Sequence, residues 1–227
     1  MKPKMILMDI EGTMVPLSFV YQKLFPYAEE VLKQCICDPD ADPEIKKAIE
    51  AERDADREGN IPKGASLEEV AARLLNWQRE DSKLKPLKIV QEHIWRHKFK
   101  EEGFFTDVYG EVKAQLDIWK EADIRLAIYS SATKGTQQIL FDNTQHGSLL
   151  DYFEDRFYDL ENAGSKKSPQ SYRKIAEDQN LKPEEICFLS DMTDELDAAK
   201  KAGFQTRHIV RESHRQAKSY DKISLGS

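Results

Sequence analysis

Apolar residues form two kinds of pattern along the chain, short uninterrupted runs and longer stretches with helical spacing. Runs of four apolar residues, bounded by polar chain, occupy residues 5–8, 126–129 and 186–189, and shorter ones fall within 153–158 and 206–210. Such runs are typical of strands that are buried on both faces. Helical spacing separates them, over residues 112–123, 136–141, 168–176 and 195–202. Strands that alternate with helices predict an α/β fold with a doubly wound parallel sheet.

A second region, between the first two predicted strands, is helical in pattern from residue 18 to residue 98. Its helices are indicated by Pro26, a charged stretch at 44–58, a capping box at Ser66 and Glu69, and Pro86. The block is far longer than a βαβ crossover needs. We therefore expect a helical domain, residues 18–98, inserted into a core of residues 1–17 and 99–227. It is a candidate lid that closes over the site, and a passive packing domain is the alternative.

Composition limits the class of protein. The chain has 227 residues, which is enough for one sizeable core with a smaller insert. No apolar run is long enough to cross a bilayer, and the first residues carry no signal-peptide pattern. We expect a soluble cytoplasmic protein, also present in the nucleus if its source is eukaryotic.

Net charge and cysteine content limit the kinds of binding partner and the redox compartment that fit this chain. The formal net charge of −7 argues against a general nucleic-acid binder, which needs a basic face. Cys35, Cys37 and Cys187 fit a reduced compartment better than a disulfide framework. No heptad or internal repeat is present, which favours a monomer. We expect a small-molecule substrate, with no nucleic-acid and no membrane partner.

Polar side chains follow three of the predicted strands at the point where each strand ends. They are Asp9, Glu11 and Thr13 after the first, Ser130 and Ser131 after the second, and Asp191, Asp194 and Glu195 after the third. Lys166 and Lys167 lie in a loop before a predicted helix. The carboxyl ends of parallel strands meet at one edge of a sheet, where ligands bind in such folds. We therefore expect these residues to lie together.

This set of groups suits phosphoryl transfer through a covalent intermediate. A carboxylate attacks phosphorus while a second acid protonates the leaving oxygen. Hydroxyls, backbone amides and a lysine hold the phosphate, and acidic ligands hold Mg²⁺. Each of these residues, taken alone, is more simply explained as an ordinary polar residue in the turn after a strand. It is improbable, however, that so many of them would gather at one sheet edge by chance.

The order of these motifs resembles that of the haloacid dehalogenase superfamily. Further stretches resemble its enolase-phosphatase family of methionine salvage: residues 9–13 (Asp-Ile-Glu-Gly-Thr), 16–20, 24–28, 93–95 (His-Ile-Trp), 128–131, 171–172, 189–191 and 195–199. Glu11 is the most telling residue, since most of the superfamily has Asp there and this family has Glu. The family's Arg-Pro-Gly ending, in contrast, is Arg211-Glu212-Ser213 here.

The resemblance implies a haloacid dehalogenase-like core with an inserted α-helical cap. It implies a Mg²⁺-dependent enzyme that enolises 2,3-diketo-5-methylthiopentyl-1-phosphate and then removes phosphate, releasing 1,2-dihydroxy-3-keto-5-methylthiopentene. Asp9 would be the nucleophile and form an aspartyl-phosphate, with Glu11 as acid and base. Asp9, Glu11 and Asp191 would hold Mg²⁺, and Ser130, Ser131 and Lys166 would bind the substrate phosphate, with Lys166 also serving catalysis. Thr13, Asp194 and Glu195 form a second group of candidates.

Other functions fit parts of the pattern. Another phosphatase of the superfamily would share the core and differ in its lid contacts. A dehalogenase would not need the second and third acids for a metal. A receiver-type signalling domain also takes phosphate on an Asp at a strand end, but it lacks the helical insert. In the insert, His93 and Trp95 are candidates for shaping the pocket, although a lone helical histidine is more often structural.

Overall fold

The structure is a computed structural model that describes residues 2–38, 42–54, 61–80, 82–101 and 103–211. The chain forms two compact units. Met1–Phe19 and Phe105–Ser227 make the first, which we call the α/β unit, and Val20–Phe104 makes the helical unit. The units therefore divide after residues 19 and 104, whereas the sequence placed the divisions after residues 17 and 98. The polar tail after Arg211 lies outside the described residues.

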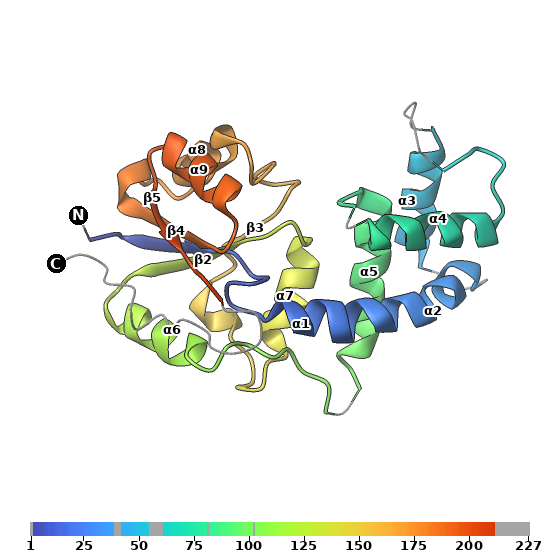
Figure 1. The fold of residues 1–227 in the computed structure, drawn as a ribbon, viewed down its shortest axis with the longest axis horizontal. Coiled ribbons are helices and arrows are strands. Elements are labelled where there is room, and N and C mark those ends of the chain that lie inside the picture. The colour runs from blue at the N-terminus through green and yellow to red at the C-terminus, as the bar shows by residue number, and fades with distance from the viewer. Residues whose placement is uncertain (1, 39–41, 55–60, 81, 102, 212–227) are drawn as a thin grey trace. The chain divides into compact units, whose positions relative to one another are not determined.

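The α/β unit is built on a sheet of five parallel strands in the order β3-β2-β1-β4-β5 (Figure 1). The strands are β1 (Met5–Met8), β2 (Arg125–Tyr129), β3 (Phe157–Tyr158), β4 (Ile186–Ser190) and β5 (Gln205–His208). All four residues of the central strand β1 are buried, as its uninterrupted apolar run predicts. The doubly wound parallel sheet is confirmed. The strand predicted within 153–158 forms only at its end, because Phe153 follows a short 3₁₀ turn, η2 (Leu150–Tyr152).

Helices cover both faces of this sheet. They are α1 (Leu17–Phe19), α6 (Val112–Glu121), α7 (Lys134–Asp142), α8 (Pro169–Asp178) and α9 (Thr193–Lys201), with a 3₁₀ turn η3 (Pro183–Glu185) before β4. In Figure 1, α8 and α9 lie on one face and α6 on the other. Alternate strand residues pack under α8 and α9, including Met5, Leu7, Tyr129 and Phe188. This packing fixes the strand ends that carry the candidate residues.

Individual residues shape the ends and the buried side of the helices in the α/β unit. Ser168 is the N-cap of α8, but its hydroxyl donates to Gln170 Oε1 and makes no capping bond. Gly203 follows α9 with φ +98°, the left-handed conformation that ends helices. Ile118 is 55% exposed, because the buried side of α6 runs through Val112, Leu116 and Trp119.

The helical unit contains a π-helical turn η1 (Val20–Leu24) and the helices α2 (Phe25–Cys37), α3 (Pro43–Asp54), α4 (Leu67–Arg79) and α5 (Lys85–Lys98). Pro26 is the second residue of α2, which directly follows the π-helical turn η1. This turn is the irregularity in an otherwise continuous helical run, which fits a residue that has no N–H for the regular helical ladder. The Ser66–Glu69 capping box is present at the start of α4. The end of the helix predicted over 44–58 lies outside the described residues. No helix in the described parts of the chain combines the length and apolar character that a membrane span requires.

Candidate active site

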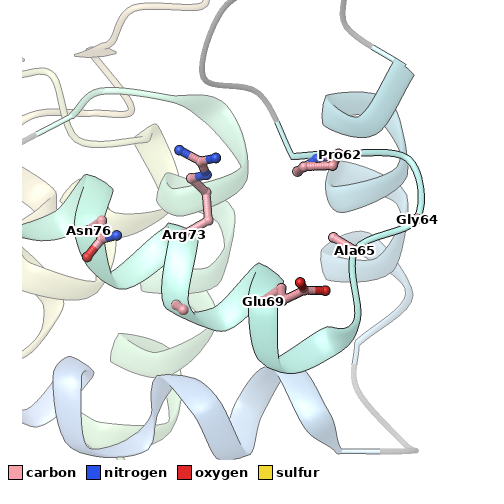
Figure 2. Close-up of a pocket in the computed structure, with 7 residues that line it drawn as sticks. Pro62, Gly64, Ala65, Glu69, Arg73 and Asn76 are labelled. Carbon is pink, nitrogen blue, oxygen red and sulfur yellow. The ribbon is translucent and has the colours of Figure 1, made fainter.

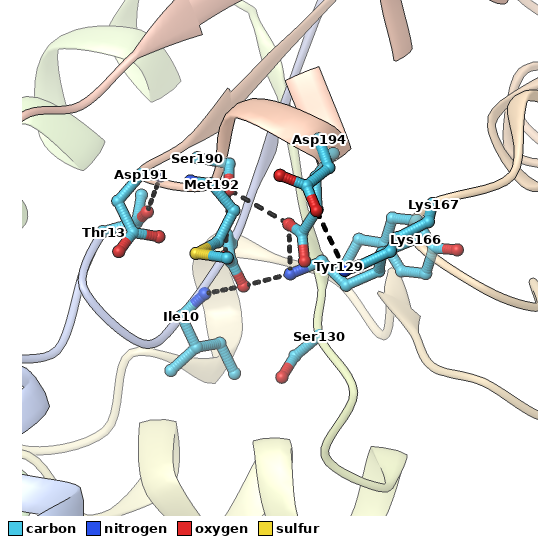
Figure 3. A network of polar contacts seen from close by, with 12 residues as sticks. Ile10, Thr13, Tyr129, Ser130, Lys166, Lys167, Ser190, Asp191, Met192 and Asp194 are labelled. Carbon is cyan, nitrogen blue, oxygen red and sulfur yellow. Dashed lines mark hydrogen bonds and ion pairs between the residues drawn. The ribbon is translucent and has the colours of Figure 1, made fainter. Parts of the chain in front are cut away.

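The carboxyl edge of the sheet collects the candidate residues (Figure 3). Asp9 follows β1, Ser130 follows β2, and Asp191 follows β4. The parallel register pairs Met8 with Leu189, so that Asp9 comes next to Ser190. The Asp9 N–H donates to Leu189 O at 2.9 Å, which extends the β1–β4 ladder by one bond. The strand ends that carry Asp9, Ser130 and Asp191 therefore lie at one edge of the sheet, as the sequence predicts.

Lys166 is the centre of the polar network. Its side chain is only 8% exposed, and its Nζ lies 2.5 Å from Asp9 Oδ1 and 2.7 Å from Glu195 Oε2. Tyr172 fixes the loop that carries it, because the Tyr172 hydroxyl donates to Lys166 O at 2.7 Å. A charge this deeply buried is stable only when it is paired. Lys166 thus holds the Asp9 carboxylate in one position.

Ser190 is a site residue that the sequence reasoning missed. Its Oγ lies 3.1 Å from Asp9 Oδ2 and 3.0 Å from Glu195 Oε2, and it accepts the Met192 N–H. A hydroxyl has one proton, so Ser190 donates to only one of the two carboxylates at a time. The signal available in the sequence was its position as the last residue of an apolar strand, directly before Asp191.

Asp191 lies on the other side of Asp9. Its Oδ1 is buried and accepts no hydrogen bond from any residue that the structure describes. Its backbone N–H donates to Thr13 Oγ1 at 3.1 Å. Gly12 (φ +70°) lies so close that a Cβ there would sit 2.2 Å from Asp191 Oδ2. A turn that needs glycine thus brings the backbone after β1 against the Asp191 carboxylate.

The polar network contains more carboxyl groups than cations. Burial raises the pKa of Asp191 to about 6, and the charges of Asp9 and Glu11 add to this shift. Burial, and then the charge of Asp9, also raises the pKa of Glu195. Burial alone would lower the pKa of Lys166, but the carboxylates of Asp9 and Glu195 outweigh it and raise that pKa. The carboxyl groups of Asp191 and Glu195 therefore resist ionisation, and such an environment favours a further cation.

The remaining predicted residues are less central. Ser130 is buried, and its Oγ accepts the Ala132 N–H at 3.1 Å. Ser131 and Glu11 are half-buried, and Glu11 forms a backbone bridge to Val15. Asp194 is exposed and pairs with Lys167 at 2.9 Å. The structure does not bring Asp194 into the network.

No group of three or more His, Cys, Asp or Glu side chains is arranged to hold a metal ion within the described residues. The buried oxygen that fits a cation is Asp191 Oδ1. The charge of Asp9 contributes to the raised pKa of Asp191, so the two carboxylates lie close enough to interact. The geometry thus offers two carboxylates and the backbone of the Gly12 turn, rather than a cage of side chains. This arrangement suits Mg²⁺, which retains several waters when bound to proteins.

The helical unit has pockets of a different kind. Figure 2 shows one that is lined by Pro62, Gly64, Ala65, Glu69, Ala72, Arg73 and Asn76. One oxygen of the Glu69 carboxylate, Oε2, accepts the Ser66 N–H in the capping box. His93 lines another pocket, with its Nδ1 3.5 Å from Asp42 Oδ2 and its ring 4.4 Å from that of His97. No lysine is among the described residues that line either pocket, so neither repeats the pairing of Lys166 with buried carboxylates.

Comparisons with known proteins identify the family of the chain. The family model for haloacid dehalogenase-like hydrolases matches residues 3–203. Enolase-phosphatase E1 of Persephonella marina is 39% identical over 230 residues, which cover 97% of this chain and 98% of that protein. Enolase-phosphatase E1 of a Sulfurihydrogenibium species is 39% identical over 98% of both chains. A solved structure, that of the UTR4 protein (unknown transcript 4 protein) of Saccharomyces cerevisiae, has a TM-score of 0.72 at 27% identity and covers 98% of this chain and 99% of that chain.

These matches confirm the resemblance drawn from the sequence motifs, and the solved structure extends it to the fold. They span nearly the full length of both proteins, so that the helical unit is included as well as the α/β unit. The chain therefore belongs to the enolase-phosphatase E1 family of haloacid dehalogenase-like hydrolases.

Proposed function

We propose that this enzyme converts 2,3-diketo-5-methylthiopentyl-1-phosphate to 1,2-dihydroxy-3-keto-5-methylthiopentene and phosphate, with Mg²⁺, in methionine salvage. The observation that carries the proposal is the buried Asp9, held by Lys166 and flanked by the unsatisfied Asp191 Oδ1. Full-length similarity to proteins named enolase-phosphatase E1 supports the choice of substrate.

The phosphatase step uses Asp9 as nucleophile. Oδ1 accepts the Ile10 N–H at 2.8 Å and the Lys166 ammonium, which leaves Oδ2 as the less committed oxygen. Oδ2 attacks phosphorus, and the bond between phosphorus and the ester oxygen breaks as a proton passes to that oxygen from Glu11. Water then hydrolyses the aspartyl-phosphate, which releases phosphate and regenerates the Asp9 carboxylate.

Mg²⁺ would be held by the Asp9 and Asp191 carboxylates together with Glu11. The unsatisfied Asp191 Oδ1 and the close approach of Gly12 support this assignment. When bound, Mg²⁺ neutralises carboxylate charge and polarises phosphoryl and carbonyl oxygens. Ser130 and Ser131 would contact the phosphate oxygens, and Lys166 would balance phosphate charge while it positions Asp9. Thr13 and Glu195 position these groups, Thr13 through the Asp191 N–H and Glu195 through Lys166.

Enolisation requires a base for the carbon acid. We assign this role to Glu11, which lies two residues after the nucleophile in the same turn. Its side chain is one methylene longer than Asp, which suits a group that reaches both the substrate carbon and the ester oxygen. We further propose that the helical unit, Val20–Phe104, acts as a lid in a monomeric cytoplasmic enzyme.

The test is a turnover assay on the diketone phosphate that follows enol absorbance and phosphate release together. We expect absorbance to rise before or with phosphate, and only when Mg²⁺ is present. Phosphate release without an enol signal would keep the phosphatase and discard the enolase. Turnover of a generic aryl phosphate alone would mean another Mg²⁺-dependent phosphatase of the superfamily.

A Glu11→Ala variant tests the base assignment separately. General acid–base groups typically contribute about 10²–10⁴-fold, so enol formation should fall by a factor in that range. Enolisation at the wild-type rate would rule Glu11 out as the base.

A further inference from the structure

Arg211 lies at the far end of the described chain, yet its side chain is only 8% exposed. In the sequence it begins the stretch Arg211-Glu212-Ser213, outside the candidate site residues. In the structure, its Nη1 lies 2.6 Å from Glu111 Oε1, its Nη2 donates to Thr13 O at 2.5 Å, and its guanidinium carbon lies 3.7 Å from the centre of the Tyr109 ring. We call these four residues the Arg211 clamp. An ion pair, a carbonyl contact and a cation–π contact on one buried guanidinium hold it in a single place.

The clamp joins two segments of the α/β unit that lead to and from the helical unit. Thr13 belongs to the segment that ends this unit's first part at Phe19, and Tyr109 and Glu111 belong to the segment that resumes it at Phe105. The Tyr109 N–H also donates to Met14 O at 3.0 Å. Arg211 thus pins the backbone of the first segment to the second.

Thr13 connects the clamp to the candidate active site. Its carbonyl accepts from Arg211, while its hydroxyl accepts the Asp191 N–H at 3.1 Å. Thr13 is fully buried and follows Gly12, where a Cβ would sit 2.2 Å from Asp191 Oδ2. A displacement of the Thr13 backbone would therefore move the support of Asp191.

We propose that Arg211 is a positioning residue for the metal site, which acts through Thr13 to hold Asp191. The inference deepens the proposed function and rests on it for the metal. Lysine does not replace arginine in this role, because an ammonium is a point charge without the planar fork that reaches Glu111 and Thr13 together. Glu111 keeps the guanidinium in place, so its loss should have the same effect in weaker form.

The experiment compares Arg211→Lys with Arg125→Lys. Arg125 is a matched control, because its Nη1 also donates to a backbone carbonyl, Gln179 O at 2.8 Å, but at the amino end of β2. The first readout is Mn²⁺ binding to the full chain by electron paramagnetic resonance. The second is the Mg²⁺ concentration for half-maximal activity, measured with kcat and KM. Glu111→Gln is the second variant, in case Arg211→Lys does not fold.

We expect Arg211→Lys to weaken Mn²⁺ binding about tenfold and to raise the half-maximal Mg²⁺ concentration by the same factor, with a smaller change in KM at saturating metal. Arg125→Lys should change neither, and Glu111→Gln should shift both by a few fold. Wild-type Mn²⁺ affinity in Arg211→Lys and Glu111→Gln would overturn the proposal, as would equal losses in Arg125→Lys. Mn²⁺ binding needs no organic substrate, so a failure of the proposed substrate would be seen separately.

Discussion

The two units differ in the polar side chains that they pair in their interiors. In the α/β unit one buried cluster is charged, with Lys166 between Asp9 and Glu195 and one oxygen of Asp191 unsatisfied. In the helical unit the buried pair Gln78 and Gln91 is neutral, although Glu52 is buried there as well. Gln91 Nε2 donates to Gln78 Oε1 at 3.2 Å, and Gln78 Nε2 donates to Phe25 O at 3.1 Å.

Charged pairs in the helical unit stay near its surface instead. Arg79 pairs with Glu29, Arg96 with Glu92, and Lys98 with Glu101, each with at least one partner that is half exposed or more. A neutral amide pair ties α2, α4 and α5 together at little desolvation cost, whereas buried charges are costly even when paired. The difference teaches that the α/β unit sacrifices stability at the sheet edge for chemistry, and that the helical unit places its polar groups for packing.

The largest expected effect comes from Asp9→Asn, which removes the nucleophile and keeps its shape. We expect phosphate release to fall about 10⁴-fold or more, as when a catalytic nucleophile is removed in other enzymes. The measurement is phosphate release with saturating Mg²⁺. Asp155→Asn is the control, because Asp155 is an exposed partner of Lys134 in the same unit, and it should retain wild-type activity. An Asp9→Asn enzyme with a tenth of the normal rate would contradict the nucleophile assignment.

Lys166→Met should combine a loss of activity with a loss of stability. It leaves Asp9 and Glu195 buried without their cation, and removing one partner of a buried pair typically costs about 3–5 kcal/mol. Phosphate release should fall about 10²–10³-fold, the usual loss for one electrostatic contact to the reacting group. Thermal unfolding and phosphate release measure the two effects.

A second substitution separates them. Lys166→Met with Glu195→Gln removes one of the two unpaired carboxylates, so it should recover part of the stability and none of the activity. If the double variant is no more stable than Lys166→Met alone, the buried charges do not carry the cost.

Much of this contrast could be predicted from local pattern. The apolar run of β1 and the polar residues after it placed Asp9 at a strand end, and the parallel sheet brought Asp191 to the same edge. The capping box of α4 was predictable for the same reason, since its two residues are three apart. Patterns of this kind report which residues lie in an element and which face they share.

Contacts that depend on register could not be predicted. Ser190 contacts Asp9 across 181 residues, and Arg211 contacts Thr13 across 198 residues. Whether Ser190 or its neighbour meets Asp9 depends on the β1–β4 register, and alternate strand residues face opposite ways. The pattern of apolar and polar positions around Arg211 does not predict its burial, because a charged residue after the last strand is normally solvated.

A smaller effect should come from Gln91→Leu in the helical unit. The change leaves Gln78 Oε1 buried without its donor, which typically costs about 1–3 kcal/mol. Gln78→Leu with Gln91→Leu removes both amides and should be closer to wild type, because no unpaired amide oxygen remains between them. Thermal unfolding of the three proteins tests this expectation. If the double variant is the least stable, the hydrogen bond between the two amides adds net stability. It then does more than offset the cost of burying them.

The smallest expected effect is a gain in thermal stability, whereas the changes above cause losses. Asp191 has a pKa of about 6 in the fold against an ordinary value of 3.8, so the folded state holds its proton more tightly between these values. The stability that this group adds is therefore present below about pH 4 and is lost as the pH rises through 6. Asp191→Asn removes the charge and keeps the shape. At pH 7, without metal, it should raise the melting temperature by about 2–4 °C, which corresponds to about 1 kcal/mol for a chain of this size.

Two measurements complete this last comparison. At pH 4.5 the advantage of Asp191→Asn should shrink, because wild-type Asp191 is then largely protonated. Added Mg²⁺ should stabilise the wild type and not the variant, since a ligand stabilises only the form that binds it. If Asp191→Asn is instead less stable than wild type in the metal-free protein at pH 7, the Asp191 charge is already compensated. The sheet edge would then be packed for stability like the helical unit, and the contrast between the two units would fail where it matters most.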